Sequence, residues 1–132
     1  MKKVFNETTE FSFIVKPSQI SGVGVFATHD ISKETYLRLT AKGGETRRVK
    51  LRDIPKEFLG QVDHISEDEA LCPLDFGHMW ICWYVNHSKN PNAVFNAVEN
   101  NFYALLDIKK GDEITIDYNG LGEPDAAKAS YY

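Results

Sequence analysis

Apolar and polar residues alternate along several short segments of the chain, and this alternation predicts β-strands. Near the N-terminus, Phe11, Phe13 and Val15 share one face of such a segment. Residues 22–28 and 35–41 form two more predicted strands. Turn-forming residues separate these segments at short intervals, so the first third of the chain is expected to form short strands.

The second half of the chain predicts a β-hairpin and a final strand. The segments at 92–98 and 101–108 are rich in apolar residues and flank a short polar turn, which is a good hairpin signal. The final strand is expected at 113–119, with Tyr118 on one face and Asp117 on the other.

One helix is predicted near residues 54–65. Asp53 is a plausible N-cap, and Pro55 is tolerated in a first helical turn. The apolar stripe of this helix consists of Phe58, Leu59 and Val62. Residues 67–77 are expected to form a loop. Many short strands with one helix indicate a mostly β domain, or a β-rich α+β domain.

The composition is that of an ordinary globular protein. The chain has 132 residues, of which 42% are hydrophobic and 26% charged, which suggests one domain with one core. No apolar run reaches the roughly 18 residues of a membrane span, and the N-terminal segment lacks the apolar stretch of a secretory signal. The net charge of −4 argues against direct binding to nucleic acid and is compatible with a cationic, lysine-bearing partner.

The two cysteines, Cys72 and Cys82, are interpreted as buried thiols in a reducing cytoplasm. A zinc site would have to combine them with His78 and His87. Neither spacing matches a known zinc finger or ribbon, so no metal is expected.

Three short motifs have ordinary structural explanations when each is taken alone. Gly22 and Gly24 could mark a β-bulge or a tight turn. Asn86 could cap a turn, and His87 could be a core histidine with its hydrogen bonds satisfied. Tyr118 could be a core tyrosine of the last strand.

The order and spacing of these motifs resemble the SET domain, the family of S-adenosylmethionine-dependent protein lysine methyltransferases. The chain has Gly-Val-Gly-Val-Phe-Ala at 22–27, Asn-His-Ser-Lys-Asn-Pro-Asn at 86–92 and Gly-Asp-Glu-Ile-Thr-Ile-Asp-Tyr-Asn at 111–119. The resemblance covers roughly residues 11–119. It implies a single SET domain over 1–132, with a short tail at 120–132. The implied fold is the β-clip, with several small sheets, a C-terminal pseudoknot and one or two short helices.

The resemblance also implies a cofactor site for S-adenosylmethionine, whose product is S-adenosylhomocysteine. The backbone near the two glycines would hold one side of the cofactor, and the Asn-His segment would hold the other. The tyrosine of the final motif would be the catalytic residue. The implied cofactor-binding residues are Gly22, Val23, Gly24, Asn86, His87 and Tyr118.

The chemistry explains why these residue types are needed. Lysine has a pKa of about 10.4 and must lose its proton before its nitrogen can attack a sulfonium methyl group. A dry channel beside a positive sulfonium lowers that pKa, so the site mainly has to align the reacting atoms. The hydroxyl of Tyr118 can orient the amine or the methyl group while it stays neutral. Candidates for the channel wall are Tyr36, Tyr84, Phe95, Phe102, Tyr103 and Ile116.

Two positions depart from the family pattern. The family often has Arg-Phe before the Asn-His-Ser segment, where this chain has Trp83 and Tyr84. It often has an aromatic residue at the position of Ile116, which bears on how many methyl groups are added. These departures leave open an alternative, a catalytically weak or inactive SET-like module that binds peptides. Methyl transfer to a non-protein amine is a third possibility.

The expected partner is a lysine-containing protein or peptide, histone or non-histone. Nucleic acid and membrane are not expected as direct partners. The pattern does not distinguish a monomer from a homodimer. A cytoplasmic location is expected, and a nuclear one, including a host nucleus, stays open.

Overall fold

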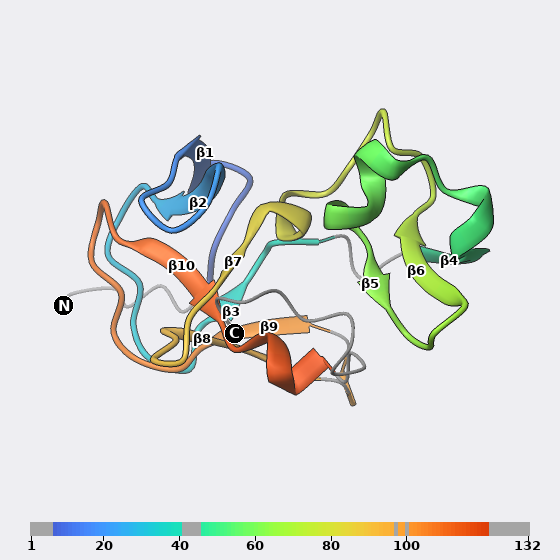
Figure 1. Ribbon diagram of the computed structural model, residues 1–132. Helices are drawn as coiled ribbons and strands as arrows, with labels where there is room; N and C mark the ends of the chain where they lie inside the picture. Colours follow the sequence, from blue (N-terminus) through green and yellow to red (C-terminus); the bar gives the residue numbers. More distant parts are fainter. Residues whose placement is uncertain (1–6, 41–45, 97, 100, 122–132) are drawn as a thin grey trace, which may run out of the picture.

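The computed structural model describes residues 7–40, 46–96, 98–99 and 101–121 (Figure 1). The strands are β1 Phe13–Pro17, β2 Val23–Ala27, β3 Tyr36–Leu37, β4 Thr46–Lys50, β5 Asp63–His64, β6 Glu69–Pro73, β7 Asn86–His87, β8 Ala93–Asn96, β9 Asn101–Ala104 and β10 Glu113–Ile116. The helical turns are η1 Leu51–Asp53, η2 Lys56–Gln61, η3 Ile81–Tyr84 and η4 Tyr118–Leu121. The fold is mostly β, with the several small sheets expected from the sequence.

A main lobe contains two of the sheets, with strand orders β1-β2-β10-β7 and β3-β9-β8. Both sheets contribute to one apolar core, in which Val25, Leu37 and Ile114 are fully buried. Burying apolar surface of this kind is the main favourable contribution to folding. The core therefore fixes how the two sheets pack against each other.

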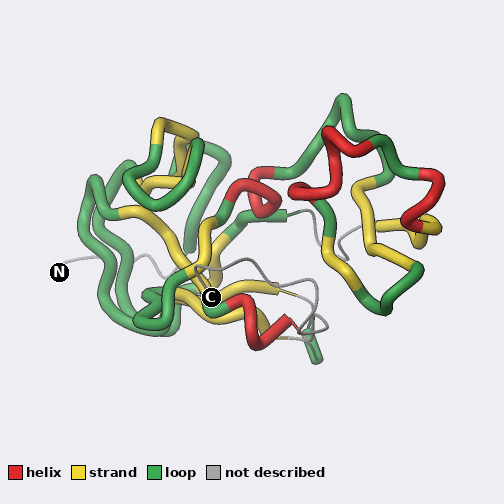
Figure 2. Tube along the Cα trace, viewed as in Figure 1, coloured by secondary structure: helices red, strands yellow, loops and turns green. Residues whose placement is uncertain are grey.

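A second lobe contains the third sheet, with strand order β4-β6-β5, together with η1 and η2. It has a small core of its own, formed by Ile54, Val62, Ala70 and Cys72. Figure 2 shows that short helical turns flank this sheet, connect the two lobes and follow β10.

Strand β10 brings distant parts of the sequence together. It pairs antiparallel with β2 and parallel with β7, where Thr115 lies opposite Asn86 and Ile116 opposite His87. Because β10 is an inner strand, Ile114, Thr115 and Ile116 are all buried. The glycine motif, the Asn-His-Ser motif and the final motif therefore lie side by side (Figure 1).

Several sequence predictions are confirmed and others are wrong. The hairpin is present as β8 and β9, and the final strand is present as β10. This strand ends at Ile116, so Tyr118 begins η4 and does not lie on a face of the strand as predicted. The predicted shared face of the first strand is wrong. Phe13 is buried, whereas Phe11 is 75% exposed and Val15 is 40% exposed. Phe11 lies in the turn before β1, and β1 is an edge strand of which only the first residue reaches the core.

The helix predicted near 54–65 is present as η2, a 3₁₀ helix of six residues, and not as a longer α-helix. It is preceded by Pro55, and no side chain caps it. Phe58 and Leu59 already pack against the second core from this short helix, and Gly60 disfavours a longer one. All helical elements among the described residues are 3₁₀ helices, where one or two short helices were expected.

The predicted loop at 67–77 contains strand β6, and β4 was not predicted. Both strands are short and lie in charged segments. Strand β6 is the middle strand of its sheet, and Ala70 and Cys72 are buried in the second core. Of the strand predicted at 35–41, only β3 forms, and residue 41 lies outside the described residues. Most of the predicted tail at 120–132 also lies outside them.

Candidate functional site

The side-chain amide of Asn86 projects from β7 into a group of oxygen atoms. Its Nδ2 lies 2.8 Å from Glu113 Oε2, 3.1 Å from Ser18 Oγ, and 3.0 and 3.2 Å from the carbonyl oxygens of Val23 and Ser21. A primary amide has only two N–H groups, so these four acceptors share its two hydrogens. Across the described residues, every hydrogen bond of this side chain involves Nδ2. The arrangement therefore fixes the direction in which the amide points.

Glu113 connects this amide to the turn before β2. The hydroxyl of Ser18 lies 2.8 and 3.0 Å from the two carboxylate oxygens of Glu113, to which it can donate one hydrogen. The same oxygen accepts hydrogen bonds from the backbone N–H groups of Ile20 and Ser21. The turn is closed by a bond from the Ser18 N–H to the Gly22 carbonyl (2.9 Å). One carboxylate thus joins the turn, β7 and β10.

The two positions of the first motif require glycine for different structural reasons. Gly22 has a φ of +48°, a conformation that other residues adopt only with strain, and no described atom lies within 4 Å of where its Cβ would be. Gly24 lacks space instead. A Cβ there would lie 2.2 Å from Glu113 Oε2 and 3.1 Å from Asn86 Nδ2. Gly22 therefore leaves open space beside the turn, and Gly24 makes room for the Asn86–Glu113 pair.

His87 and Tyr118 face each other across the pairing of β7 with the end of β10. The backbone N–H of Tyr118 donates to His87 Nδ1 (3.0 Å), so in the neutral ring the proton is on Nε2. The two rings lie 5.2 Å apart, centre to centre. The Tyr118 hydroxyl donates to the carbonyl oxygen of Val85, immediately before β7. Tyr118 is therefore held at both its backbone and its hydroxyl group.

Asn92 fixes the position of β10 and was not singled out from the sequence. Its Oδ1 accepts from the Thr115 N–H (2.9 Å), and its Nδ2 donates to the Glu113 carbonyl (2.8 Å). Glu113 and Ser18 were also missed. Asn92 and Glu113 both belong to the quoted motifs, so a closer reading of those motifs could have identified them. Ser18 carries no comparable signal.

Four of the six candidate channel residues lie at the core of the main lobe. Ile116 and Phe102 are buried there, and Tyr84 and Phe95 are half-buried against the same cluster, as is Tyr118. Phe95 also packs on Phe102, with 5.0 Å between ring centres.

The other two candidates, Tyr36 and Tyr103, lie on the outer face of the β3-β9-β8 sheet. Their neighbours Leu37 and Phe102 are buried, and side chains alternate between faces along a strand. The two tyrosine rings contact each other edge to face, with centres 6.1 Å apart. A hydrogen bond to the Glu99 carboxylate raises the pKa of Tyr103. The structure thus brings this pair together, but on a different face from Phe95.

The cysteines are free thiols in separate surroundings. Cys72 belongs to the second core, and Cys82 packs against the main core, where burial raises its pKa to about 12. Among the described residues, no three His, Cys, Asp or Glu side chains are grouped to hold a metal ion. None of the helices in this part of the chain is long and apolar enough to cross a membrane.

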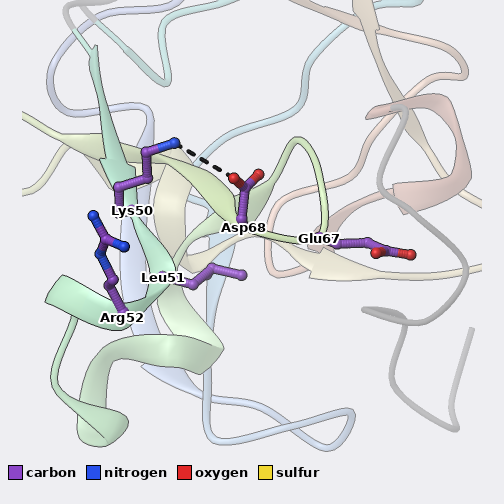
Figure 3. A pocket seen from close by; sticks show the side chains of 5 residues that line it. All are labelled: Lys50, Leu51, Arg52, Glu67 and Asp68. Carbon is purple, nitrogen blue, oxygen red and sulfur yellow. Dashed lines mark hydrogen bonds and ion pairs between the residues drawn. The ribbon is translucent and has the colours of Figure 1, made fainter.

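A pocket of about 310 Å³ lies on the second lobe, away from Asn86 and Tyr118. Figure 3 shows its lining side chains, which are Lys50, Leu51, Arg52, Glu67 and Asp68. It is lined mainly by charged groups at the end of β4, in η1 and just before β6.

Comparisons with known proteins bear on the family and the fold. The family model described as "SET domain" matches residues 22–119. A crystal structure from Plasmodium falciparum, of a protein assigned as a histone methyltransferase, is similar with a TM-score of 0.52 and 26% sequence identity. That similarity covers 83% of this chain and 95% of the other. No curated protein matches the chain.

Proposed function

Because the chain belongs to the SET domain family, we propose that it is a protein-lysine N-methyltransferase that uses S-adenosylmethionine and acts as a single SET domain over residues 1–132. The observation that carries the proposal is the parallel pairing of β7 with β10. It places Asn86 and His87 beside the strand that leads to Tyr118. The family relationship supports methyl transfer in general. We propose in addition that lysine is the methyl acceptor and S-adenosylmethionine the methyl donor.

The residues present fit such a cofactor. Gly22 leaves open space beside a turn whose backbone is held by Ser18, so a ligand can approach the main chain closely there. With its Nδ2 engaged by four acceptors, Asn86 would offer Oδ1 to the cofactor's ammonium group. The backbone of Val23, Gly24 and His87 would complete the contacts. When bound, S-adenosylmethionine supplies a methyl group activated by a sulfonium.

Tyr118 is proposed as the catalytic residue. Its hydroxyl donates to the Val85 carbonyl, which fixes the orientation of the O–H group and makes the oxygen an acceptor. The oxygen can therefore orient a lysine amine or polarised C–H groups without ionising. Tyr118 would contribute mainly by alignment, which is the largest requirement of this reaction.

The substrate amine must be neutral before it can act as a nucleophile. A lysine ammonium that enters an apolar channel loses water, and desolvation lowers its pKa from about 10.4. Tyr84, Phe95 and Ile116 would line such a channel, a proposal supported by their packing in the same core cluster as Tyr118. The net charge of −4 favours approach of a cationic protein segment.

A thermal melt with S-adenosylhomocysteine tests the cofactor site. Ligand at about 100 times its dissociation constant stabilises a fold by roughly 2.7 kcal/mol, which raises the midpoint by several degrees in a domain of this size. We expect such a rise for the wild type and little rise for Asn86→Ala. A well-folded wild type that gives no shift with either form of the cofactor would contradict the proposal.

Label found only in small-molecule fractions after incubation with labelled cofactor would point to a non-protein amine.

A further inference from the structure

The edge strand of the second lobe has backbone groups that point away from the sheet. The N–H of Leu51 donates to the carbonyl of Asp68 (2.8 Å), one step beyond the opposed pair of Lys50 and Glu69. In an antiparallel ladder, hydrogen-bonded pairs alternate with pairs that are not bonded. The odd-numbered positions of β4 therefore bond to β6. The even-numbered positions, which include Arg48 and Lys50, direct their N–H and C=O groups toward the outer edge of β4, next to which the described residues form no strand.

The side chains at these same positions are cationic. Arg48 and Lys50 lie two residues apart and so share one face of the sheet, opposite the face on which Val49 packs against the second core. Both are exposed. Within the described part of the chain, Arg48 forms no ion pair. The edge thus presents two adjacent positions that each combine an outward backbone group with a positive side chain.

Lys50 already has one acidic neighbour. Its Nζ lies 3.4 Å from Asp68 Oδ2, and Figure 3 shows the two side chains reaching toward each other, whereas Glu67 points away. Both partners of this ion pair are largely exposed, and such pairs contribute little to stability. A carboxylate on an incoming strand can therefore replace Asp68 as the partner of Lys50 at a small cost in free energy. A second carboxylate of the same strand can pair with Arg48.

We propose that the open edge of β4 is a docking site for an extended acidic segment of a partner protein. An added strand would continue the ladder through the backbone of Arg48 and Lys50. Side chains directly opposite each other in paired strands lie about 4.5–5.5 Å apart, and opposite charges there are favourable. The fitting segment therefore carries Asp or Glu at alternate positions. In Figure 1, β5 lies on the side of the main lobe and β4 on the outer side, so this edge is separate from the proposed catalytic site.

Two other occupants fit less well. A second copy paired through β4 about a two-fold axis would place Arg48 opposite Arg48 or Lys50 of the other copy, and like charges directly opposite each other are destabilising. Nucleic acid would not continue the β-ladder through the outward N–H and C=O groups of β4. Its phosphates would also be repelled by Glu67 and Asp68, which line the same pocket as Lys50. An acidic peptide strand uses both the ladder and the cations.

The test is binding of a labelled peptide in which Glu alternates with Thr, followed by fluorescence anisotropy without cofactor. The matched peptide has Lys in place of each Glu. We expect the acidic peptide to bind and the Lys peptide not to bind. Arg48→Ala combined with Lys50→Ala should weaken binding at least about tenfold, whereas Lys109→Ala, an exposed cation of the main lobe, should not change it.

Two further measurements test the strand geometry. Arg48→Pro removes the outward N–H without removing a bond to β6, so it should weaken binding more than Arg48→Ala does. Bound peptide should slow amide hydrogen exchange at Arg48 and Lys50. Equal binding of the two peptides, binding unaffected by the double variant, or competition by a single-stranded oligonucleotide but not by unlabelled acidic peptide would each overturn the proposal. So would a folded protein that binds no acidic peptide.

Discussion

The Asn86 amide nitrogen on β7 lies 2.8 Å from the Glu113 carboxylate on β10, and this contact joins the Asn-His-Ser motif to the final strand. Ser18 reaches the same carboxylate from the turn before β2. Glu113 therefore acts together with the turn, which also contacts the Asn86 amide directly through Ser18 and Ser21, to determine where Asn86 points. The cofactor site proposed for these residues depends on this carboxylate although Glu113 need not touch the cofactor.

Glu113→Gln should weaken binding of S-adenosylhomocysteine about tenfold. The substituted amide carries N–H donors where Asn86 and Ser18 also donate, and losing one hydrogen bond to a charged group costs about 1.5–3 kcal/mol. Isothermal titration calorimetry measures the change. Glu57→Gln, an exposed acid of the second lobe, is the matched control and should leave affinity unchanged. Equal affinities in the wild type and Glu113→Gln would remove Glu113 from the account.

Gly24→Ala should destabilise the protein by about 1–3 kcal/mol, because its Cβ would lie 2.2 Å from Glu113 Oε2. The carboxylate can move aside only by breaking its contacts with Ser18 and Asn86. In a Glu113→Ala background the same substitution should cost much less, since the clashing atoms are gone. Urea denaturation of the four proteins of this double-mutant cycle measures the coupling. Additive effects would show that Gly24 is required for some other reason.

Tyr118→Phe should reduce turnover by about 100-fold, the loss typical of a misplaced reacting group. The variant also loses the hydrogen bond to the Val85 carbonyl, which should lower the free energy of unfolding by about 1 kcal/mol. Affinity for S-adenosylhomocysteine should stay close to that of the wild type. Methyl transfer under saturating cofactor gives the turnover, and a rate equal to that of the wild type would exclude Tyr118 from the mechanism.

Cys82 should make stability fall at alkaline pH. Burial raises the pKa of this thiol from 9.0 to about 12, so the folded state keeps the proton where the unfolded chain releases it. The contribution of this thiol to the free energy of unfolding is fully present below pH 9.0 and is lost as the pH rises toward about 12. Within that window, the free energy of unfolding should fall by at most about 1.4 kcal/mol per pH unit from this group. Chemical denaturation of the wild type and Cys82→Ala measures it, and parallel pH profiles would contradict the assignment.

The motifs predicted the fold better than the local patterns did. Tyr118 and Asn86 are recognisable because their neighbours in sequence belong to the quoted motifs, and the structure places both motifs on paired strands. The helix near 54–65 is a short 3₁₀ helix because Phe58 and Leu59 already reach the second core from the six residues of η2. The shared face of the first strand failed because Phe11 lies in the turn before β1 and because alternation does not reveal that β1 is an edge strand.

The sequence pattern could not predict contacts between residues that lie far apart along the chain. The Ser18–Glu113 hydrogen bond spans most of the chain, and nothing in the local sequence near Ser18 indicates it. The backbone near Gly24 was expected to hold one side of the cofactor, and the contact of this glycine with Glu113 gives a second reason for it that only the packing reveals. The separation of Tyr36 and Tyr103 from Phe95 likewise follows from sheet pairing and not from residue type.

The most direct test of the account is mass-spectrometric identification of the methylated residue in a pool of protein substrates, with S-adenosylmethionine as the methyl donor. Wild type, Asn86→Ala and Tyr118→Phe are compared at equal concentration after each has been checked for folding. The account predicts new methyl groups on lysine side chains with the wild type and strong reduction with both variants. Methylation found only on other residue types, or equal lysine methylation by all three proteins, would contradict it.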